Sequence, residues 1–172
     1  RSCINIANNL KIPYIRIRAS ANDNKEARVE AIKTVITEIL PKKKKKSVAL
    51  LVETTGVFCD TAILRDLLDD FASDNLAALW DMHSPYFVCG ETADTTIKNL
   101  GAYVKHVHIK DAIKTENGIE FCLMGEGEMP IGDMMLGLRS VNYNGFISLE
   151  WDPKWCEELD DMEIIFSQFV NF

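Results

Sequence analysis

Residues 48–53 read VALLVE and residues 76–81 read LAALWD. Both segments are almost entirely apolar until a last, acidic residue. Strands buried on both faces have this pattern, and such strands belong to parallel sheets covered by helices. Three further segments are also predicted to be strands, and the first of them alternates more, with arginines between its isoleucines. They are 12–18 (IPYIRIR), 104–110 (VKHVHIK) and 145–150 (GFISLE).

Helical patterns fill the gaps between these strands. In 24–40 and 61–72 the apolar residues recur at helical spacing and form one stripe. Strands that alternate with helices predict right-handed βαβ units, and therefore an α/β fold with a parallel sheet. The predicted helices are 24–40, 61–72, 91–100, 133–140 and 160–169.

The spacing of the strand ends refines the fold class. Glu53 and Asp81 are 28 residues apart, Asp81 and His108 are 27 apart, and His108 and Glu150 are 42 apart. A (β/α)8 barrel uses roughly 31 residues per unit, so this chain holds about five and a half units. We expect a partial (β/α)8 TIM barrel of about five βα units with the first strands absent. An open doubly wound sheet is the alternative, but no Gly-rich phosphate fingerprint follows any strand.

Composition and length predict one globular domain over residues 1–172. Apolar residues make up 47% of the chain, and 19 basic against 26 acidic residues give a net charge of −7. An acidic domain repels phosphate backbones, so no nucleic-acid partner is expected. No apolar run reaches the roughly 18 residues of a membrane-spanning helix. The chain does not begin with Met, and we expect it to be a piece of a longer protein.

Three smaller features have structural interpretations. Five widely spaced cysteines without a CxxC pair indicate reduced thiols and a cytoplasmic protein. The lysine run 42–46 is interpreted as a solvated loop rather than a nucleic-acid or membrane patch. A helix-to-strand loop lies at the barrel face opposite the active-site face. The segment 125–130 (GEGEMP) fits neither nucleotide-binding glycine motif, so we expect a tight turn.

Four consecutive strands end in a side chain that can bind a metal ion. The carboxyl ends of barrel strands carry the chemistry. One polar tip is commonplace, but three carboxylates in one barrel mouth would raise each other's pKa, and a divalent cation removes that cost. Three carboxylates with one imidazole suit Mn²⁺, Mg²⁺, Co²⁺ or Fe²⁺, with Zn²⁺ as a further option. The tips are Glu53, Asp81, His108 and Glu150.

The order of these motifs resembles the xylose isomerase-like TIM barrels, the sugar-phosphate isomerase and epimerase superfamily that also includes endonuclease IV. The resemblance covers nearly the whole chain from residue 12 and corresponds to the family's last five strands. The matching stretches are LLVETTG, AALWDMHSPY, VKHVHIKD, LMGEGEMP and NYNGFISLEW.

The resemblance implies a divalent-metal-dependent isomerase or epimerase of a sugar or polyol. It implies that the four tips hold one metal ion, for which Mn²⁺ is preferred. It also implies that Glu53 and Glu150 act as acid and base on opposite sides of a substrate carbon. The metal would chelate neighbouring oxygens of a ketose and acidify the adjacent C–H, so that an enediolate forms and is reprotonated.

Two positions depart from the family's pattern. Ser84 stands where many members have a substrate-binding His, with His83 one place early, and Lys114 stands where many epimerases have an Arg. We expect these three residues to bind the substrate. Lys110, whose strand parity points it inward, and Trp155, in a loop after a strand tip, complete the expected substrate-binding set.

Several residues near the tips also have a purely structural interpretation. An ion pair with Asp111 at the barrel rim is the more common role for a residue placed like Lys110. A packed histidine is favoured for His106 over a second metal ligand. Trp80 and Trp151 should point away from the barrel mouth and pack under the helices.

Other functions compete with the isomerase prediction. A lyase or dehydratase on the same scaffold would use the same metal and glutamates, because both reactions start with proton abstraction beside a carbonyl. A nuclease is disfavoured because the chain has only three histidines and is acidic. A non-catalytic fragment or a domain of a larger protein is the third alternative. Open strand edges predict a homodimer, or another association that covers the barrel edge.

Overall fold

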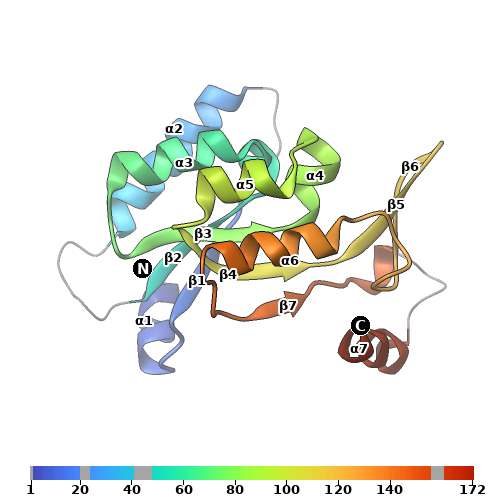
Figure 1. The fold of residues 1–172 in the computed structure, drawn as a ribbon. Helices are drawn as coiled ribbons and strands as arrows, with labels where there is room; N and C mark the ends of the chain where they lie inside the picture. The colour runs from blue at the N-terminus through green and yellow to red at the C-terminus, as the bar shows by residue number, and fades with distance from the viewer. Residues whose placement is uncertain (1, 20–23, 41–47, 156–160) are drawn as a thin grey trace.

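The computed structural model of the chain describes residues 2–19, 24–40, 48–155 and 161–172. Five parallel strands form a curled half-barrel in the order β1-β2-β3-β4-β7 (Figure 1). The predicted partial TIM barrel is therefore confirmed. The strands are β1 (Tyr14–Ile17), β2 (Ala49–Glu53), β3 (Leu76–Asp81), β4 (Val104–Ile109) and β7 (Ile147–Leu149).

The helices that connect these strands cover one face of the sheet (Figure 1). This arrangement differs from a doubly wound sheet, which has helices on both faces. The covering helices are α2 (Lys25–Ile39), α3 (Thr61–Phe71), α5 (Ala93–Leu100) and α6 (Ile131–Ser140). The remaining helical elements are α1 (Ser2–Asn9), η1 (Gly56–Cys59), α4 (His83–Cys89), η2 (Pro153–Trp155) and α7 (Met162–Asn171). Of these five elements, only α7 corresponds to a predicted helix, 160–169.

The main hydrophobic core lies between the sheet and the helices. Alternate strand residues point to this side, and among them Trp80 is 1% exposed, which confirms its predicted orientation. Leu64, Leu67 and Leu68 of α3 are buried in the same core. Full burial of a large apolar side chain contributes about 1.5–3 kcal/mol. The helix-side core therefore supplies most of the stabilisation that holds the strand ends in place.

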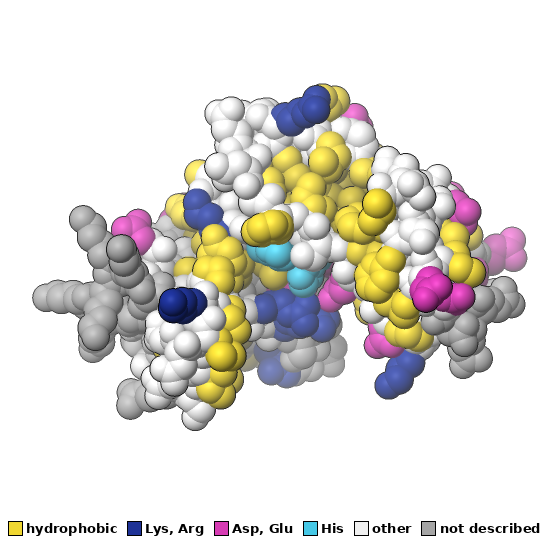
Figure 2. Space-filling model, turned by 90° about the horizontal axis from the view of Figure 1, so that it is seen from below, with side chains coloured by type: hydrophobic (Ala, Val, Ile, Leu, Met, Phe, Trp, Pro, Cys, Tyr) yellow, Lys and Arg dark blue, Asp and Glu magenta, His cyan; other side chains and the backbone are white. Residues whose placement is uncertain are grey.

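The opposite, concave face of the sheet carries a second, small cluster of buried side chains, Leu51, Ala77 and Leu79. Figure 2 looks onto this face and shows histidine side chains at its centre, next to Lys and Arg side chains. A cavity of about 410 Å³ opens here, and its lining includes Tyr14 and Arg16. The concave face is thus polar toward the carboxyl ends of the strands and apolar below them.

A β-hairpin that was not predicted follows β4. It pairs β5 (Asp111–Thr115) with β6 (Gly118–Cys122) as a separate antiparallel sheet. Its turn consists of Glu116 and Asn117, and Gly118, the first residue of β6, has a φ of 130°. An Asn-Gly pair is a turn signal in a sequence, and here it marks the end of the turn. The hairpin accounts for the long interval between His108 and Glu150.

The segment after this hairpin forms a turn around an acidic side chain. The backbone N–H groups of Gly125, Gly127 and Met129 donate to the carboxylate of Asp111 at 2.9, 3.0 and 3.3 Å. A Cβ atom on Gly127 would lie 2.0 Å from Asp111 Oδ1, so this close approach requires glycine. The predicted tight turn is present, and its amides bind a carboxylate of the same chain.

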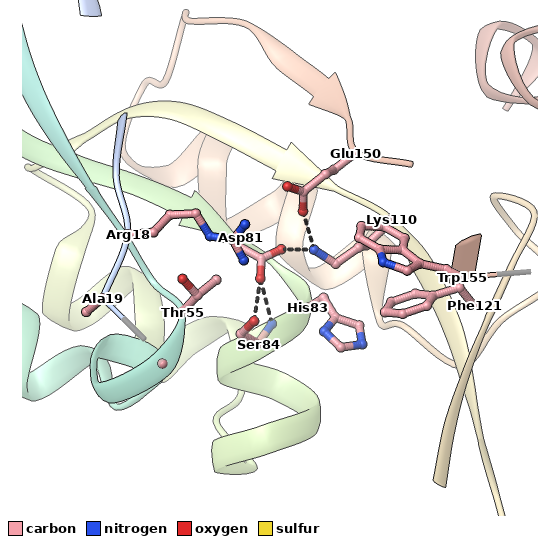
Figure 3. A pocket seen from close by; sticks show the side chains of 11 residues that line it. Arg18, Ala19, Thr55, Asp81, His83, Ser84, Lys110, Phe121, Glu150 and Trp155 are labelled. Atoms are coloured by element: carbon pink, nitrogen blue, oxygen red, sulfur yellow. Dashed lines mark hydrogen bonds and ion pairs between the residues drawn. The ribbon is translucent and has the colours of Figure 1, made fainter. Parts of the chain in front are cut away.

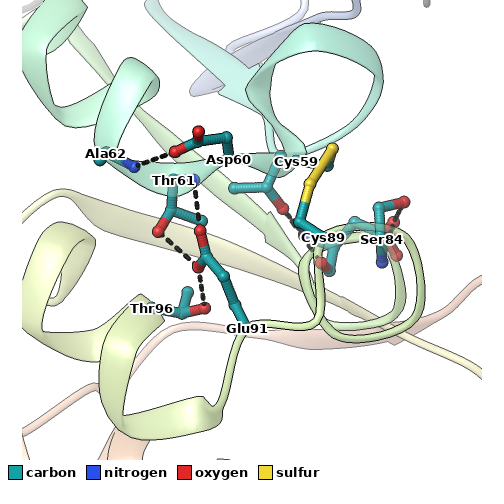
Figure 4. The surroundings of a disulfide bond; sticks show 10 residues. Cys59, Asp60, Thr61, Ala62, Ser84, Cys89, Glu91 and Thr96 are labelled. Atoms are coloured by element: carbon teal, nitrogen blue, oxygen red, sulfur yellow. Dashed lines mark hydrogen bonds between the residues drawn. A yellow bond between two sulfur atoms is a disulfide. The ribbon is translucent and has the colours of Figure 1, made fainter.

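A disulfide joins the loops that follow β2 and β3 (Figure 4). It links Cys59 to Cys89 across a Cα–Cα distance of 6.0 Å. The expectation of reduced thiols is therefore wrong for this pair. Beside the disulfide, the Glu91 carboxylate accepts hydrogen bonds from Thr61 N and Oγ1 and from Thr96 Oγ1, at 2.8, 2.7 and 3.0 Å. Neighbouring parallel strands bring these loops together although they are 30 residues apart in sequence.

The last two expectations concern the lysine run and membrane-spanning helices. The lysine run 42–46 lies outside the described residues, so the predicted loop there is not tested. Within the described ranges, no helix combines the length and the apolar composition needed to cross a membrane.

Candidate metal and substrate site

The candidate metal ligands lie at the carboxyl ends of adjacent strands, on the concave side. Asp81 is directly opposite His108 in the β3–β4 register, and Glu53 is opposite Leu79 in the β2–β3 register. The side chains of Glu53 and Asp81 are fully buried, while those of His108 and Glu150 are 14% and 21% exposed. The site therefore opens to solvent on the side of β7.

Three of the four tips form a compact trio. His108 Nδ1 lies 3.0 Å from Glu53 Oε1 and 3.8 Å from Glu150 Oε1. The three residues can each offer one ligand atom, and these atoms lie within 4.8 Å of one another. Ligands of one divalent ion, bonded at about 2.0–2.3 Å, lie up to about 4.6 Å apart. Two carboxylates and an imidazole at these separations fit such an ion with small side-chain rotations.

Asp81 is joined to the trio through a lysine (Figure 3). Its Oδ1 accepts a 2.8 Å hydrogen bond from Lys110 Nζ, which also donates to Glu150 Oε2 at 2.5 Å. Its Oδ2 accepts from the hydroxyl and the backbone N–H of Ser84. Both oxygens of Asp81 are thus already bonded, so it stands apart from the trio.

Lys110 is a buried cation between two carboxylates. Burial lowers the pKa of Lys110, but the two carboxylates of Asp81 and Glu150 together raise it by more. The pKa of Lys110 therefore lies above its ordinary value. The ammonium group also lies 5.5 Å from the ring centroid of Trp155. Among the described ion pairs Lys110 contacts Asp81 and Glu150, and not Asp111. The rim ion pair that was the structural alternative is therefore wrong.

Two arginines of the site were not predicted. Arg16 Nη1 lies 3.2 Å from Glu53 Oε1 and 3.1 Å from Glu150 Oε1, and Arg18 Nε lies 2.9 Å from Glu53 Oε2. Burial raises the pKa of Glu150, but Lys110, His108 and Arg16 together hold it below its ordinary value. The sequence signal was the alternation in IPYIRIR, which puts Arg16 of β1 and Arg18, just after β1, on the same side of the chain.

A cavity of about 630 Å³ opens above the strand ends (Figure 3). One wall is aromatic: Phe121 lies 5.1 Å from His83 and 4.6 Å from Trp155 between ring centroids. Burial lowers the pKa of His83, with a smaller lowering effect from Lys110. The full lining is Arg18, Ala19, Thr55, Gly56, Asp81, His83, Ser84, Lys110, Phe121, Glu150 and Trp155.

Four of the five predicted substrate-binding residues line this cavity, namely His83, Ser84, Lys110 and Trp155. The fifth, Lys114, lies on β5 with an exposed side chain, and its backbone N–H donates to Glu128. Lys114 is therefore not brought together with the others, because the hairpin carries it away from the strand ends.

His106 lies on the concave face, outside the trio. Its Nε2 is 2.9 Å from Ser148 Oγ, and burial and the neighbouring His108 lower its pKa. It lines the 410 Å³ cavity together with Arg16 and His108. This geometry supports the packed-histidine interpretation over a second metal ligand.

A parallel half-barrel with carboxylates and a histidine at its strand ends has the architecture of the (β/α)8 enzymes, whose active sites lie at that face. A family model described as "Xylose isomerase-like TIM barrel" matches residues 1–164. The chain therefore belongs to the xylose isomerase-like TIM barrel family. Among curated proteins, none matches this chain.

Solved structures share the fold at low sequence identity. The IOLI protein with a bound zinc atom superposes with a TM-score of 0.77 at 15% identity, over 98% of this chain and 64% of that one. D-psicose 3-epimerase gives 0.70 at 19% identity, over 98% and 64%. The probable 3-DHS dehydratase AsbF from Bacillus anthracis gives 0.66 at 18% identity, over 87% and 61%. This chain thus spans less than two thirds of the length of these relatives.

Proposed function

We propose that this chain carries the metal- and substrate-binding face of a divalent-metal-dependent isomerase or epimerase of a sugar or polyol. The observation that carries the proposal is the trio of Glu53, His108 and Glu150, whose ligand atoms lie within 4.8 Å of one another. Of the three residues, Glu150 also lines the 630 Å³ cavity. A D-psicose 3-epimerase among the structures with the same fold is consistent with this substrate class.

The metal ligands proposed are the trio together with Asp81. The donor set of carboxylates and one imidazole suits Mn²⁺, which we prefer, and also Mg²⁺, Co²⁺, Fe²⁺ or Zn²⁺. A zinc atom is bound in the IOLI relative. A divalent ion in this position would polarise neighbouring carbonyl and hydroxyl oxygens of a substrate and make the adjacent C–H more acidic.

The chain's own residues would then bind the substrate and move the proton. Glu53 and Glu150 come from strands on opposite sides of the site, so one can remove a proton and the other return one on the opposite face. Lys110, kept protonated by its two carboxylates, can donate to a substrate oxygen. The aromatic wall of Phe121 and Trp155 can stack on the apolar face of a ring.

A dehydratase or other lyase is the second candidate. The buried ammonium group of Lys110 at the cavity supports it, because a donor at this place can protonate a departing hydroxyl group. A relative with the same fold is a probable 3-DHS dehydratase. A non-catalytic fragment or domain of a larger protein is the third candidate, because the chain spans only part of the length of its relatives.

We also propose the setting in which the site works. Residues 1–172 would form one domain in a protein that binds no nucleic acid. The half-barrel has β1 and β7 as edge strands, and Phe146 beside β7 is 80% exposed. A homodimer, or another association that covers this open edge, would remove exposed strand edges and apolar surface from water.

Two measurements test the proposed function. Mass spectrometry of the purified chain should find about one bound divalent ion per chain after incubation with Mn²⁺, and Glu150→Gln and Glu53→Gln should each lose it. In deuterated water, an isomerase would exchange the hydrogen next to the carbonyl of a ketose, whereas a dehydratase would also release water. Retention of the bound ion by both glutamine variants would exclude the proposed ligands.

A further inference from the structure

We infer that Arg16 competes with the metal ion for the candidate site and leaves its two glutamates when the ion binds. Arg16 bridges Glu53 and Glu150, which are two of the three residues in the trio. This inference rests on the proposed function, since it concerns the same site, and it adds a residue that sets the metal affinity.

The distances make the competition unavoidable. Arg16 Nη1 lies 3.2 Å from Glu53 Oε1 and 3.1 Å from Glu150 Oε1. An ion bonded to either oxygen at about 2.1 Å would lie no further than about 5 Å from this nitrogen, by the triangle inequality. His108 Nδ1 approaches the same Glu53 oxygen at 3.0 Å. The guanidinium and the ion would therefore share one small, largely buried volume.

The charges of the site point the same way. Its three carboxylates, on Glu53, Asp81 and Glu150, are contacted by three cationic side chains. The cationic residues are Arg16, Arg18 and Lys110. The formal charges of these six side chains thus sum to zero before a divalent ion enters. The sum becomes +2 if the ion binds and all three cationic side chains stay. Departure of one cationic side chain lowers the final sum to +1, so an exchange of one cation for the ion is favoured electrostatically.

Burial excludes Lys110 as the side chain that moves and leaves Arg16 free to do so. Lys110 is 6% exposed, is bonded to both Asp81 and Glu150, and lies against Trp155, so its departure would leave the buried Asp81 carboxylate without its cation. Arg16 is 40% exposed and comes from β1, an edge strand of the sheet. It also lines the 410 Å³ cavity below the site, which offers room for its side chain.

Arg18 has a different role in this scheme. Its side chain is 58% exposed, and its Nε contacts the other oxygen of Glu53, Oε2. The Oε1 atom of Glu53, which faces His108 and Arg16, stays accessible to an ion while Arg18 remains in place. Arg16 is therefore a positioning residue that holds the two glutamates near each other until the ion replaces it.

Isothermal titration calorimetry with Mn²⁺ alone tests the inference without measuring activity. The chain would be stripped with a chelator and titrated as the wild type, Arg16→Gln, Arg16→Lys and the control Arg139→Gln. Arg139 is an exposed residue in the last turn of α6. Arg16→Gln should bind Mn²⁺ at least tenfold more tightly than the wild type. The wild type must first break the contacts of Arg16 with both glutamates, and hydrogen bonds between charged groups are strong enough to change a dissociation constant by this factor.

The other variants separate charge from shape. Arg16→Lys keeps the charge and should bind Mn²⁺ within about threefold of the wild type, as should Arg139→Gln. Equal or weaker Mn²⁺ binding by Arg16→Gln would overturn the inference while leaving the proposed metal site standing. Absence of binding by the wild type and by Arg16→Gln alike would refute the metal site itself. Binding by Arg16→Gln alone would support the competition.

Discussion

Replacing Lys110 with Met should destabilise the chain strongly at neutral pH. The ammonium group is the only described cation that bonds to Asp81, whose side chain is fully buried, and it also bonds to Glu150. Methionine fills nearly the same volume but carries no charge. The substitution would leave the Asp81 carboxylate buried with only the hydrogen bonds from Ser84.

The size of the effect follows from this burial. Removing one partner of a buried ion pair costs about 3–5 kcal/mol. Glu150 is 21% exposed and keeps its contact with Arg16, so we expect the lower end, about 3 kcal/mol. In a chain of this length each kcal/mol shifts Tm by about 2–4 °C, which gives a decrease of about 6–12 °C.

Urea unfolding, followed by tryptophan fluorescence in the presence of a chelator, measures this cost. Lys105→Met is the matched control, because Lys105 is an exposed residue of β4, the strand that ends just before Lys110, and should change the free energy of unfolding by less than about 0.5 kcal/mol. Adding Asp81→Asn to Lys110→Met should recover much of the loss, since no uncompensated carboxylate then remains. If Lys110→Met unfolds like the control, the buried ion pair does not exist in solution.

The pH dependence gives an independent check on the same pair. The pKa of Glu150 lies below its ordinary value of 4.5. The contribution of the Glu150 carboxylate to stability is therefore present above about pH 4.5 and is lost as pH falls through the folded-state pKa. The pKa of Lys110 lies above its ordinary value of 10.5, so its contribution is present below that pH and is lost as pH rises through the folded-state value. The difference in the free energy of unfolding between Lys110→Met and the wild type should therefore become smaller below pH 4.5. A difference that stays constant down to pH 3 would contradict this account.

Two further changes test the loops around the site. Reduction of the Cys59–Cys89 disulfide, or Cys59→Ser, should lower the free energy of unfolding by about 3–4 kcal/mol, because the bond closes a loop of 30 residues; equal urea midpoints with and without a reductant would show that the bond does not form. Gly127→Ala should cost at least about 2 kcal/mol and lower Tm, because its Cβ would collide with the Asp111 carboxylate and free buried amides. An unchanged Tm for this variant would show that the turn has room for a side chain.

Much of the fold follows from simple sequence patterns. Apolar runs that end in a polar residue mark β2 and β3, and the spacing between their ends indicates barrel geometry rather than a doubly wound sheet. Alternation along a strand also assigns faces correctly: Trp80 packs under the helices, while Leu79 and Leu51 face the concave side. These features depend on residues close together in sequence, which is why a single sequence reveals them.

Other features depend on contacts that a sequence does not encode locally. The disulfide joins cysteines that only adjacent parallel strands bring together, so the odd count and wide spacing of the cysteines were misleading. The hairpin after β4 was missed although Asn117-Gly118 is a known turn signal, because its strands are short and partly exposed. The same hairpin moves Lys114 away from the cavity that its spacing from His108 suggested.

The three cations at the site show why its electrostatics escape a strand-by-strand prediction. The alternation of residues along a strand indicates which face of the sheet a side chain lies on. It does not indicate how far along the barrel axis the side chain reaches. Arg16 pairs in register with Leu51, two residues below Glu53, a rise of about 6.6 Å. Its long side chain spans that height, and Lys110 reaches Asp81 and Glu150 from beyond the end of β4. Long cationic side chains from other heights thus neutralise a ring of acidic tips. For an ion bound at the proposed site, we expect the affinity to depend on which of these cations can leave, and therefore on their burial and contacts as well as on the identity of the ligands.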